Sequence, residues 1–429
     1  MIIYYIYKYI IINILYLIFK LYSYFNEKAY SRESAWQELL NNVPEKSGLR
    51  ILVHAASMGE FEQAKPLIEE IKKLNPEIEI IASFFSPSGF ENQKDYSQID
   101  YSLYLPIDTE VNSVTFVKKV NPDIAIFVRY ELWSNILSEL KKSNCRNYLI
   151  CATKPNSKYI YNNYFGTEYL NHCYNQFDKV FTVSDVDSEF IQAISKSVSV
   201  VTSTDTRTDR ILSVVTQARN NPVLPKNILD NCITLIAGSS WEKDEEIIAG
   251  SVNQINSVDF KIRVIYVPHV PNEKNILRIS GYHSKTILLS KLLKELETIP
   301  KINHNSILEM KHIVVDSIGS LLQLYGNSDI AYVGCGFGDG VHSVSEPAGY
   351  GLPIICGPNI SSMPDAVRLF ERQSLIIIKN SEELIRVLNN LINDDELRYK
   401  LGKQNQEYIL DNSGSSKKIV EIILNNDSN

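Results

Sequence analysis

Apolar and polar residues alternate along most of the chain in a pattern that predicts short strands separated by amphipathic helices. Segment 61–75 has apolar residues at positions 61, 64, 67, 68, 71 and 74, the spacing of one helix face. In the first half of the chain, the strand-like runs are apolar on both faces. They lie at 49–57, 78–85, 123–130, 147–153 and 179–184. Strands of this kind predict a parallel sheet that helices cover on both sides.

The pattern stops near residue 212 and restarts at residue 233. The later runs lie at 233–240, 261–269, 285–290, 312–317, 330–336, 353–358 and 374–379. Between the two series, the polar stretch 217–227 carries two prolines and three asparagines, which favours a linker. The sequence therefore predicts the α/β class, with two facing Rossmann-like domains at 23–216 and 228–429. Open parallel sheets bind ligands beyond the carboxyl ends of their strands, so chemistry is expected there.

The N-terminus has a different composition. Residues 2–19 contain one charge, Lys8, and are otherwise almost all aliphatic or tyrosine. As a helix they would extend about 27 Å, close to a thin hydrocarbon core. No small-residue cleavage site follows, so residues 1–22 are interpreted as a retained membrane anchor. Three placements remain open: a spanning helix, a helix in the plane of the interface, or a hydrophobic helix packed on the next domain.

Composition narrows the function class. The chain has 429 residues, 44% hydrophobic and 22% charged, which is ordinary for globular proteins and suits two domains. Lys and Arg total 43 against 50 Asp and Glu, so general nucleic-acid binding is disfavoured. The six cysteines form no CxxC pair and the seven histidines form no metal motif. No disulfide framework, metal site or cofactor is predicted.

Polar groups gather at the predicted strand ends of the first half. The first strand ends in SMGE (57–60), where Gly59 allows a tight turn and Glu60 would lie at a helix N-terminus. This spacing also fits a capping box, so capping and catalysis are both open for Glu60. The second strand ends in SPSG (86–89) and the third in RYELW (129–133), which brings a second carboxylate, Glu131. A carboxylate-lined site is one interpretation; a turn and a surface ion pair are the other.

The second half has a glycine-rich segment between two predicted strands. GSSW (238–241) closes a strand before an acidic helix, a weak indication of an anion site. Segment 330–358 then contains GCGFG, HS, EPAG and GLP. The E-P-x-x-x-G-x-P pattern is typical of two-domain nucleotide-sugar transferases, in which the glutamate accepts hydrogen bonds from a ribose diol. A helix-capping glutamate is the alternative.

Ten motifs in order resemble the 3-deoxy-D-manno-octulosonic acid (Kdo) transferase family of lipopolysaccharide inner-core synthesis. They are the apolar N-terminus, HAASMGEFEQAKPLI (54–68), SPSGFE (86–91), YLPID (104–108), RYELWSNIL (129–137), DTRTDR (205–210), GSSWEKDEE (238–246), VPHVPNE (267–273), DSIGSLLQLYGNSDIAYVG (316–334) and HSVSEPAGYGLPIICGP (342–358). The resemblance implies the GT-B architecture of two facing Rossmann-like domains. It implies inverting transfer of Kdo from CMP-Kdo to a lipid A precursor without an essential metal. It also implies an enzyme held at the cytoplasmic face of the inner membrane, with membrane lipid as a partner.

The resemblance also assigns residues. The family's general base matches Glu60, and two positions that stabilise the transition state match Glu131 and Arg207. The donor-binding positions match Pro268, His269, Ile318, Gly319, Ser320, Ser343, Val344, Ser345 and Glu346. The chain departs from the usual family residues at Ser343, His269 and Tyr130.

Two other functions remain open. One is a different two-domain transferase or an epimerase that uses another nucleotide sugar. The other is a catalytically silent, membrane-tethered nucleotide-binding protein. Asp185 and Asp187 resemble the D-x-D metal motif of a different transferase fold, but they directly follow a predicted strand and open a helix, which favours capping.

Overall fold

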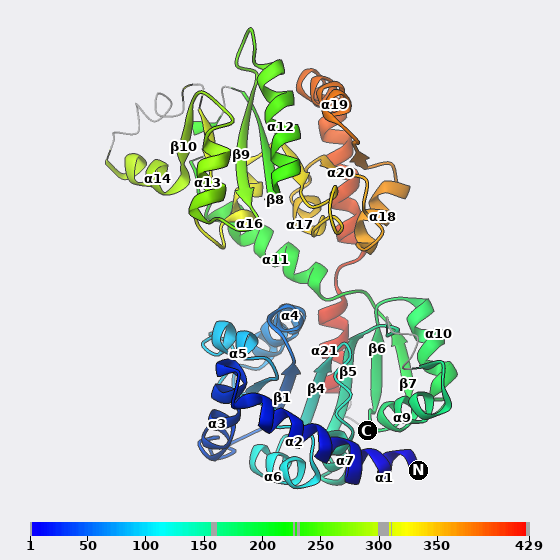
Figure 1. Ribbon diagram of the computed structural model, residues 1–429. Coiled ribbons are helices and arrows are strands. Elements are labelled where there is room, and N and C mark those ends of the chain that lie inside the picture. Colours follow the sequence, from blue (N-terminus) through cyan, green and yellow to red (C-terminus); the bar gives the residue numbers. More distant parts are fainter. Residues whose placement is uncertain are drawn as a thin grey trace. The chain divides into compact units, whose positions relative to one another are not determined.

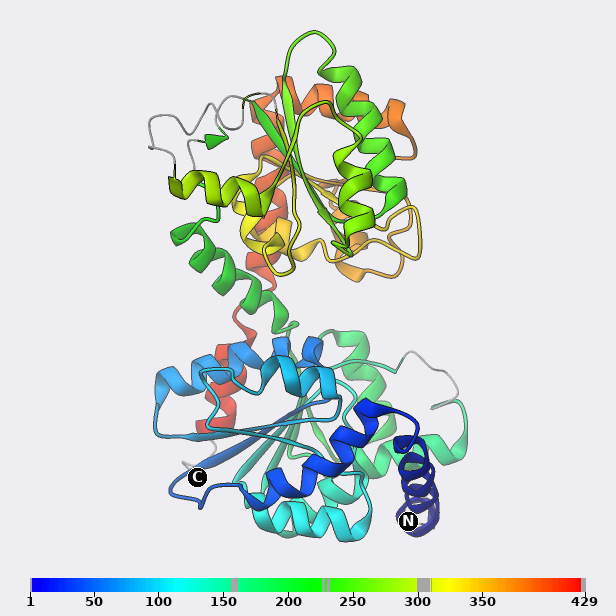
Figure 2. The same cartoon turned by 60° about the vertical axis from the view of Figure 1, so that its left-hand side comes forward.

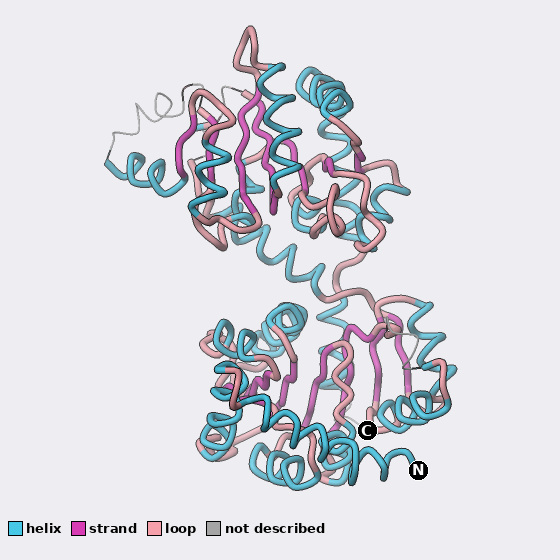
Figure 3. Tube along the Cα trace, viewed as in Figure 1, coloured by secondary structure: helices cyan, strands magenta, loops and turns pink. Residues whose placement is uncertain are grey.

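The chain forms two compact α/β units in a computed structural model that describes residues 2–155, 161–225, 228–229, 232–298, 309 and 311–425 (Figure 1). The first unit contains residues 1–210 together with 412–429, and the second contains residues 211–411. Helices and strands alternate along each unit (Figure 3).

The first unit is built on a seven-stranded parallel sheet with the order β3-β2-β1-β4-β5-β6-β7. Its strands are β1 (Arg50–Ala55), β2 (Glu79–Phe84), β3 (Tyr101–Tyr104), β4 (Ile124–Val128), β5 (Arg146–Ala152), β6 (Lys179–Thr182) and β7 (Ser199–Thr202). The central strands β1 and β4 are buried along their whole length, as expected for a sheet covered on both faces.

The helices of the first unit lie on both faces of this sheet (Figures 1 and 2). They are α1 (Ile2–Ile6), η1 (Tyr7–Ile11), α2 (Ile12–Ser23), α3 (Glu27–Asn41), α4 (Met58–Leu74), α5 (Pro87–Gln93), α6 (Glu110–Val120), α7 (Ser134–Lys142), α9 (Tyr164–Tyr174), α10 (Asp185–Ile194) and α21 (Ser415–Asn425). The apolar face of α4 that the sequence predicts is buried at Phe61, Ala64, Leu67, Ile68 and Ile71. Leu74, at the end of the helix, is exposed.

The second unit has another seven-stranded parallel sheet, with the order β10-β11-β9-β8-β12-β13-β14. Its strands are β8 (Ile233–Ser240), β9 (Ile262–Pro268), β10 (Thr286–Leu288), β11 (His312–Val314), β12 (Ile330–Val333), β13 (Ile354–Cys356) and β14 (Leu375–Ile377). Leu235 and Ile236 belong to two different core clusters, so each face of the sheet has its own core. Alternate residues of a strand point to opposite faces, which explains this division.

The described helices of the second unit complete the layers over this sheet (Figures 1 and 2). They are α11 (Arg207–Asn220), α12 (Glu242–Ile255), α13 (Glu273–Ser280), α14 (Leu289–Thr298), α16 (Leu321–Leu324), η4 (Tyr325–Asn327), α17 (Ser345–Gly349), α18 (Pro364–Glu371), α19 (Ser381–Asn393) and α20 (Asp395–Asp411). Helix α11 begins in the first unit and continues into the second.

The α/β class is confirmed, and the two sheets are of the Rossmann type. The sequence pattern missed two strands of the first sheet, β3 and β7. Both have only four residues, and β7 has no buried residue because it forms a sheet edge. A strand of this kind lacks the run of apolar residues on which the prediction depended.

The division of the chain differs from the expected boundaries in two respects. The expected linker 217–227 begins inside α11, which continues to Asn220. The last residues of the chain return to the first unit, where Ile419, Val420 and Ile423 of α21 lie in the core. The apolar stripe of α21 is visible in the sequence, but a stripe does not say which sheet it covers.

Candidate active site

Glu60 lies where β1 ends and α4 begins. Ser57 is the N-cap of α4, and its hydroxyl oxygen accepts from the Glu60 backbone N–H at 3.4 Å. Glu60 Oε2 in turn accepts from the Ser57 backbone N–H at 2.9 Å and from the Ser57 hydroxyl at 3.2 Å. The capping box is therefore present. Among the described residues, no donor contacts Glu60 Oε1, so one oxygen of the carboxylate is unused.

Glu131 follows β4, the neighbour of β1 in the sheet. Its Oε2 accepts from Trp133 Nε1 at 2.6 Å and lies 3.1 Å from His54 Nε2. On the other side of the ring, His54 Nδ1 lies 2.9 Å from the Ser83 hydroxyl of β2. Glu131 is thus held by groups from β1 and from the segment after β4, and His54 connects it to β2.

The two carboxylates influence each other. Burial raises the pKa of Glu60, and the negative charge of Glu131 raises it further. Hydrogen bonds from Ser57 act in the opposite direction. A carboxylate with a raised pKa is a better proton acceptor than an ordinary exposed one, which is the property a general base requires.

The N-termini of α4 and α5 lie close together beside Glu60. Gly89, in the first turn of α5, lies so near α4 that a Cβ there would be 3.2 Å from the Met58 backbone nitrogen and 3.3 Å from the Ser57 carbonyl carbon. Gly59, which the sequence singles out for a tight turn, would place a Cβ in open space. The glycine in a tight contact is therefore Gly89, where the second strand end lies against the first.

Arg207 begins α11, after the edge strand β7. Its backbone N–H donates to Asp205 Oδ1 at 2.9 Å, and the same oxygen accepts from Gln63 Nε2 of α4 at 2.8 Å. Asp205 Oδ2 lies 3.7 Å from Arg129 Nη2. Asp205 therefore connects the segment before Arg207 to α4 and to the segment that contains Glu131. Among the described residues, the Arg207 guanidinium has no hydrogen bond or ion pair.

Unused polar atoms remain in the same region. Arg129 Nε and Gln63 Oε1 are buried without a hydrogen-bond partner. Arg129 also has a φ of 63°, which an arginine rarely adopts. A buried group left unpaired is costly, so this end of the sheet has polar atoms that a ligand could satisfy.

In the second unit, the predicted donor-binding residues lie at or after the carboxyl ends of β9, β11 and β12, and β8 lies between β9 and β12. Pro268 ends β9 and His269 follows it, 318–320 come after β11, and 343–346 come after β12. Since β11, β9, β8 and β12 are consecutive in a parallel sheet, their carboxyl ends share one edge. The structure brings these residues to the same edge of one sheet.

Stacked rings connect the loops that follow β8, β9 and β12. The rings are those of Trp241, His269 and His342. His269 stacks on His342 at 4.8 Å between ring centroids, and Trp241 stacks on His269 at 5.0 Å. Trp241 Nε1 donates to His342 Nε2 at 3.2 Å. Burial, and then the neighbouring His269, lower the pKa of His342, which keeps this ring neutral. Trp241 and His342 have no predicted role in the sequence interpretation.

Glu346 stands at the start of α17 and accepts a short hydrogen bond from the Ser343 hydroxyl. Ser345, by contrast, is buried and donates to Asp365 Oδ2 at 2.7 Å, while Tyr408 donates to the other oxygen of Asp365 at 2.5 Å. Ser345 therefore connects α17 to α18 and α20. Glu346 is partly exposed, whereas Ser345 beside it is buried.

The loop after β11 is exposed at Ile318 and bends at Gly319, where φ is 98°. The Ser320 side-chain oxygen is buried without a hydrogen-bond partner. The conformation at Gly319 favours glycine, since a side chain there would strain the backbone.

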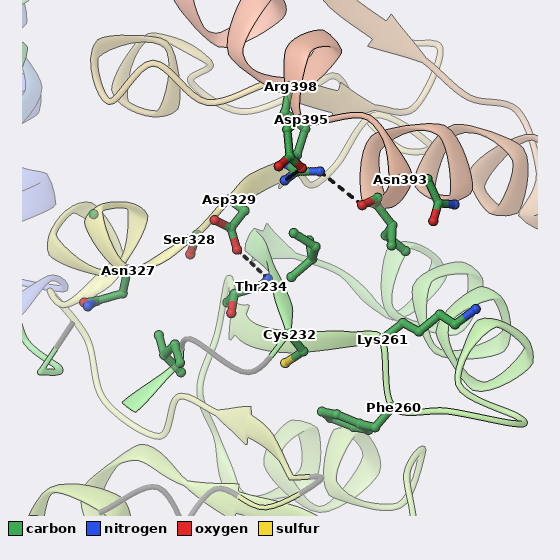
Figure 4. A pocket seen from close by; sticks show the side chains of 14 residues that line it. Cys232, Thr234, Phe260, Lys261, Asn327, Ser328, Asp329, Asn393, Asp395 and Arg398 are labelled. Atoms are coloured by element: carbon green, nitrogen blue, oxygen red, sulfur yellow. Dashed lines mark hydrogen bonds and ion pairs between the residues drawn. The ribbon is translucent and has the colours of Figure 1, made fainter. Parts of the chain in front are cut away.

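A cavity of about 800 Å³ lies at the opposite edge of the second sheet (Figure 4). Thr234, Lys261 and Asp329 line it from segments that precede or begin β8, β9 and β12. Its Arg398 guanidinium donates to carbonyls near the end of α19 and to Asp395, so this arginine closes a helix end. The cavity is at the amino ends of the strands, away from the predicted donor-binding residues.

Asp185 and Asp187 belong to the start of α10. The N-cap is Ser184, whose side-chain oxygen accepts from the Asp187 backbone N–H at 3.2 Å, and Asp187 Oδ1 accepts from the Lys154 backbone N–H at 2.7 Å. The capping interpretation is therefore corrected in its residue: the N-cap is Ser184, and Asp185 and Asp187 lie in the first turn of α10, where negative charge suits a helix N-terminus. Within the described parts of the chain, no cluster of three or more His, Cys, Asp or Glu could hold a metal ion.

Two solved structures share this two-sheet fold. The UDP-GlcNAc 2-epimerase from Neisseria meningitidis has a TM-score of 0.60 and 13% sequence identity, covering 88% of this chain and all of that one. MurG of Acinetobacter baumannii has a TM-score of 0.53 and 12% identity over a similar share. These similarities support the GT-B type of fold.

The sequence relatives indicate the family. Residues 29–210 match the family described as 3-deoxy-D-manno-octulosonic-acid transferase (kdotransferase). The 3-deoxy-D-manno-octulosonic acid transferase of Haemophilus influenzae is 24% identical over 385 residues, which are 87% of this chain and 86% of the relative. That of Rickettsia prowazekii is 27% identical over 383 residues, 87% of this chain and 78% of the relative. Because the family match lies in the first unit and these relatives align across most of both units, the chain resembles 3-deoxy-D-manno-octulosonic acid transferases over most of its length.

Proposed function

We propose that the chain is a Kdo transferase, which moves Kdo from CMP-Kdo to a hydroxyl of a lipid A precursor with inversion at the transferred sugar. The family supports the reaction class. The observation that carries the residue assignment is Glu60, a carboxylate at a strand end with one unused oxygen and a raised pKa.

In this proposal Glu60 is the general base. Its Oε1 takes the proton of the acceptor hydroxyl as that oxygen bonds to the anomeric carbon of Kdo, while CMP leaves from the opposite face with the bonding electron pair. Oε2 stays in the capping box, which holds the carboxylate in place. Capping and catalysis are therefore compatible, because each uses a different oxygen.

Glu131 and Arg207 have supporting roles. Glu131 is fixed by Trp133 and His54, and its charge keeps the Glu60 pKa raised. Arg207 has a guanidinium without an internal partner among the described residues, so it is available to a carboxylate or phosphate of the substrates. Arg129 lies beside Asp205 with an unpaired Nε and could serve the same purpose.

The second unit would bind the donor. Glu346 is suited to accept hydrogen bonds from ribose hydroxyls, because a carboxylate offers two acceptor oxygens to a diol. Ser343 donates to this carboxylate and so positions Glu346, and its hydroxyl oxygen remains available to accept a hydrogen bond from the donor. His269, Ile318, Gly319 and Ser320 belong to neighbouring loops of the same edge, and Pro268, Val344 and Ser345 form the buried support beneath them.

The proposed location follows from the acceptor. A lipid A precursor is an amphiphile, so the enzyme would work at the cytoplasmic face of the inner membrane. Helix Ile2–Ser23 has 22 residues and is the one described helix long and apolar enough to cross a membrane. By itself this is weak support for a membrane anchor.

The deciding experiment is Glu60→Gln with Glu77→Gln as its matched control, since Glu77 is exposed before β2. Each protein is incubated with CMP-Kdo and tetraacylated lipid A precursor, and products are counted by mass spectrometry. We expect Glu60→Gln to lose about 10²–10⁴-fold in rate, as for other general bases, while Glu77→Gln keeps the parent rate. The glutamine retains an oxygen for the cap, so both variants should melt at the parent temperature.

An unchanged rate in Glu60→Gln would leave Glu60 with a capping role alone. A parent chain that binds CMP-Kdo but transfers nothing would favour the silent nucleotide-binding protein. Turnover of a uridine nucleotide sugar in place of CMP-Kdo would favour the other transferase or epimerase.

A further inference from the structure

The N-terminal helix Ile2–Ser23 lies along the surface of the first unit (Figures 1 and 2). We propose that this helix binds a lipid bilayer in the plane of its surface, with its polar side held by the first unit and its apolar side in lipid. The inference rests on the membrane association proposed above and chooses among the placements that the sequence leaves open.

Two polar side chains attach the first part of the helix to the unit. The Tyr7 hydroxyl donates to Asp108 Oδ2 at 2.9 Å. Lys8 Nζ lies 2.7 Å from Glu110 Oε1, and this lysine is buried. Asp108 is fully buried and also accepts from the backbone N–H groups of Asn135 and Ile136 at the start of α7. The helix is therefore bound to a fixed point of the fold.

The contacts continue along the helix. The Tyr4 ring stacks on His172 of α9 at 4.1 Å between centroids. Further along, the Tyr16 hydroxyl donates to Glu33 Oε1 at 3.0 Å, and the Arg32 guanidinium lies over the Phe19 ring at 5.2 Å. Polar and aromatic contacts between this helix and the rest of the first unit thus extend from its first turn to its second-last turn.

The side chains that face the unit recur about every four residues. They include Tyr4, Lys8, Ile12, Tyr16 and Ser23, which are buried or half-buried. Residues three or four apart lie on one face of a helix. Lys8 and Tyr16 share this face, so their contacts with Glu110 and Glu33 remove these polar groups from the outer side.

The outer side is mostly apolar, and Asn13 and Lys20 are the exposed polar residues of the helix. Its exposed large residues are Ile2, Tyr5, Tyr9, Ile10, Ile11, Ile14, Leu15, Leu17, Ile18, Leu21 and Tyr22, with Tyr24 and Phe25 directly after the helix. Leu17 is 61% exposed and Phe25 is 90% exposed. A contiguous apolar surface of this extent marks an interaction site, and tyrosines are enriched where protein meets the bilayer interface.

Binding in the plane of a bilayer surface accounts for both sides of the helix, the polar side and the apolar side. A spanning helix would have to leave the unit, which would place Lys8 in hydrocarbon and leave the buried Asp108 without Tyr7. A helix that only packs on the domain would leave the apolar stripe in water. An in-plane helix keeps every polar contact and buries the stripe in lipid, as interfacial helices do.

The first test locates the N-terminus. A cysteine is added ahead of Met1 of the full chain, the protein is bound to preformed phosphatidylethanolamine–phosphatidylglycerol vesicles, and a membrane-impermeant maleimide is supplied outside. The parent chain gives the background from its own cysteines. We expect the added thiol to react to the same extent with and without detergent. Protection of that thiol until detergent is added would show that the helix spans and would overturn the proposal.

The second test measures docking with a matched pair of variants. Tyr7→Phe removes the hydrogen bond to Asp108, whereas Tyr9→Phe changes an exposed tyrosine whose hydroxyl has no partner among the described residues. On vesicles, we expect Tyr7→Phe to lower the melting temperature by about 3 °C or more and Tyr9→Phe to leave it unchanged. Equal melting of the two variants would show that the helix is not docked in the membrane-bound state.

The third test identifies the occupant and separates this inference from the proposed function. Leu17→Asp combined with Leu21→Asp should abolish flotation with the vesicles, and Lys73→Asp, an exposed change on α4, should not. If the parent chain does not float but forms a dimer that the double variant disrupts, a second copy covers the stripe and the proposal fails. Transfer to detergent-dispersed acceptor is measured in parallel, since it tests the reaction without any need for the helix.

Discussion

At the scale of single residues, the site contains two carboxylates, and the oxygens of Glu60 make different contacts. Glu60 uses Oε2 in the cap of α4, and Oε1 has no donor among the described residues. Glu131 is held by the ring nitrogens of Trp133 and His54. The distance between strand ends β1 and β4 is fixed by the sheet, so the electrostatic influence of Glu131 on Glu60 is built into the fold.

This influence predicts a change in pH dependence. Burial and the charge of Glu131 both raise the Glu60 pKa, so the acidic limb of kcat/KM should lie above the pH range of an ordinary glutamate. Glu131→Gln removes the like charge, so the Glu60 pKa falls and the acidic limb moves to lower pH, even though the rate itself decreases. A pH profile of the residual transfer checks this. If the acidic limb of kcat/KM lies at the parent pH in both Glu131→Gln and the control Glu77→Gln, Glu60 is not the titrating base.

A second residue prediction concerns the donor. Glu346→Ala removes the acceptor that we assign to the ribose hydroxyls, and a hydrogen bond to a charged group is worth about 1.5–3 kcal/mol. The dissociation constant for CMP should therefore rise about 10- to 150-fold. Calorimetry with CMP alone measures this. Glu371→Ala, an exposed carboxylate at the end of α18, is the control and should bind as the parent does.

If Glu346→Ala bound CMP with the parent affinity, Glu346 would have only the local role that its hydrogen bond from Ser343 indicates.

At the scale of elements, helix α20 packs against the loop after α17 through two glycines. A Cβ on Gly402 would overlap the carbonyl oxygen of Gly351, so the helix can approach this loop only with glycine at 402. Asn405, one turn further along α20, donates to the Leu352 carbonyl at 2.8 Å. The close approach therefore positions the EPAGYGLP segment (346–353), which contains Glu346.

This packing can be tested with two helical glycines. Gly402→Ala should lower the stability of the second unit by about 1–3 kcal/mol, since extra atoms in a tight contact force the backbone to move. Gly250→Ala in α12 meets nothing within 4 Å and should raise stability by about 0.5–1 kcal/mol through helix propensity. Calorimetric unfolding of both variants gives the two values. A Gly402→Ala protein as stable as Gly250→Ala would mean that α20 can move away from the loop.

At the scale of the whole molecule, the two ends of the chain both belong to the first unit. The N-terminal helix docks on it through Tyr7 and Lys8, and α21 adds Ile419, Val420 and Ile423 to its core. Asp209 also accepts from the backbone N–H groups of Gly414 and Ser416. The unit that contains Glu60 and Glu131 is thus completed by segments about 400 positions apart in the sequence.

The docked N-terminal helix leads to a prediction for the whole enzyme. Deletion of residues 1–22 should release the protein from vesicles while CMP binding, which we assign to the second unit, stays unchanged. Transfer to detergent-dispersed acceptor should survive in part, and transfer to acceptor in vesicles should fall much further, because the anchored enzyme has a high effective concentration of acceptor. Transfer assays in the two media give the ratio. A truncated protein equally active in both, or still bound to vesicles, would contradict a membrane role for the helix.

The sequence by itself determined the α/β class, every strand except the two edge strands of the first sheet, the resemblance to the Kdo transferases, and the positions of Glu60 and Glu131 near strand ends and of Glu346 between two strands. It could do so because a strand buried on both faces has to be a run of apolar residues, and because polar residues at its end are conspicuous. Only the tertiary structure decided which groups surround these residues. His54 is one polar residue within a buried strand, and the sequence does not reveal that its ring reaches Glu131 from β1. In the same way, an apolar run such as 2–19 fixes hydrophobicity but not placement. The placement of the helix depends on Asp108 and Glu110, which lie about 100 positions away in the sequence. Only folding brings these residues to Tyr7 and Lys8.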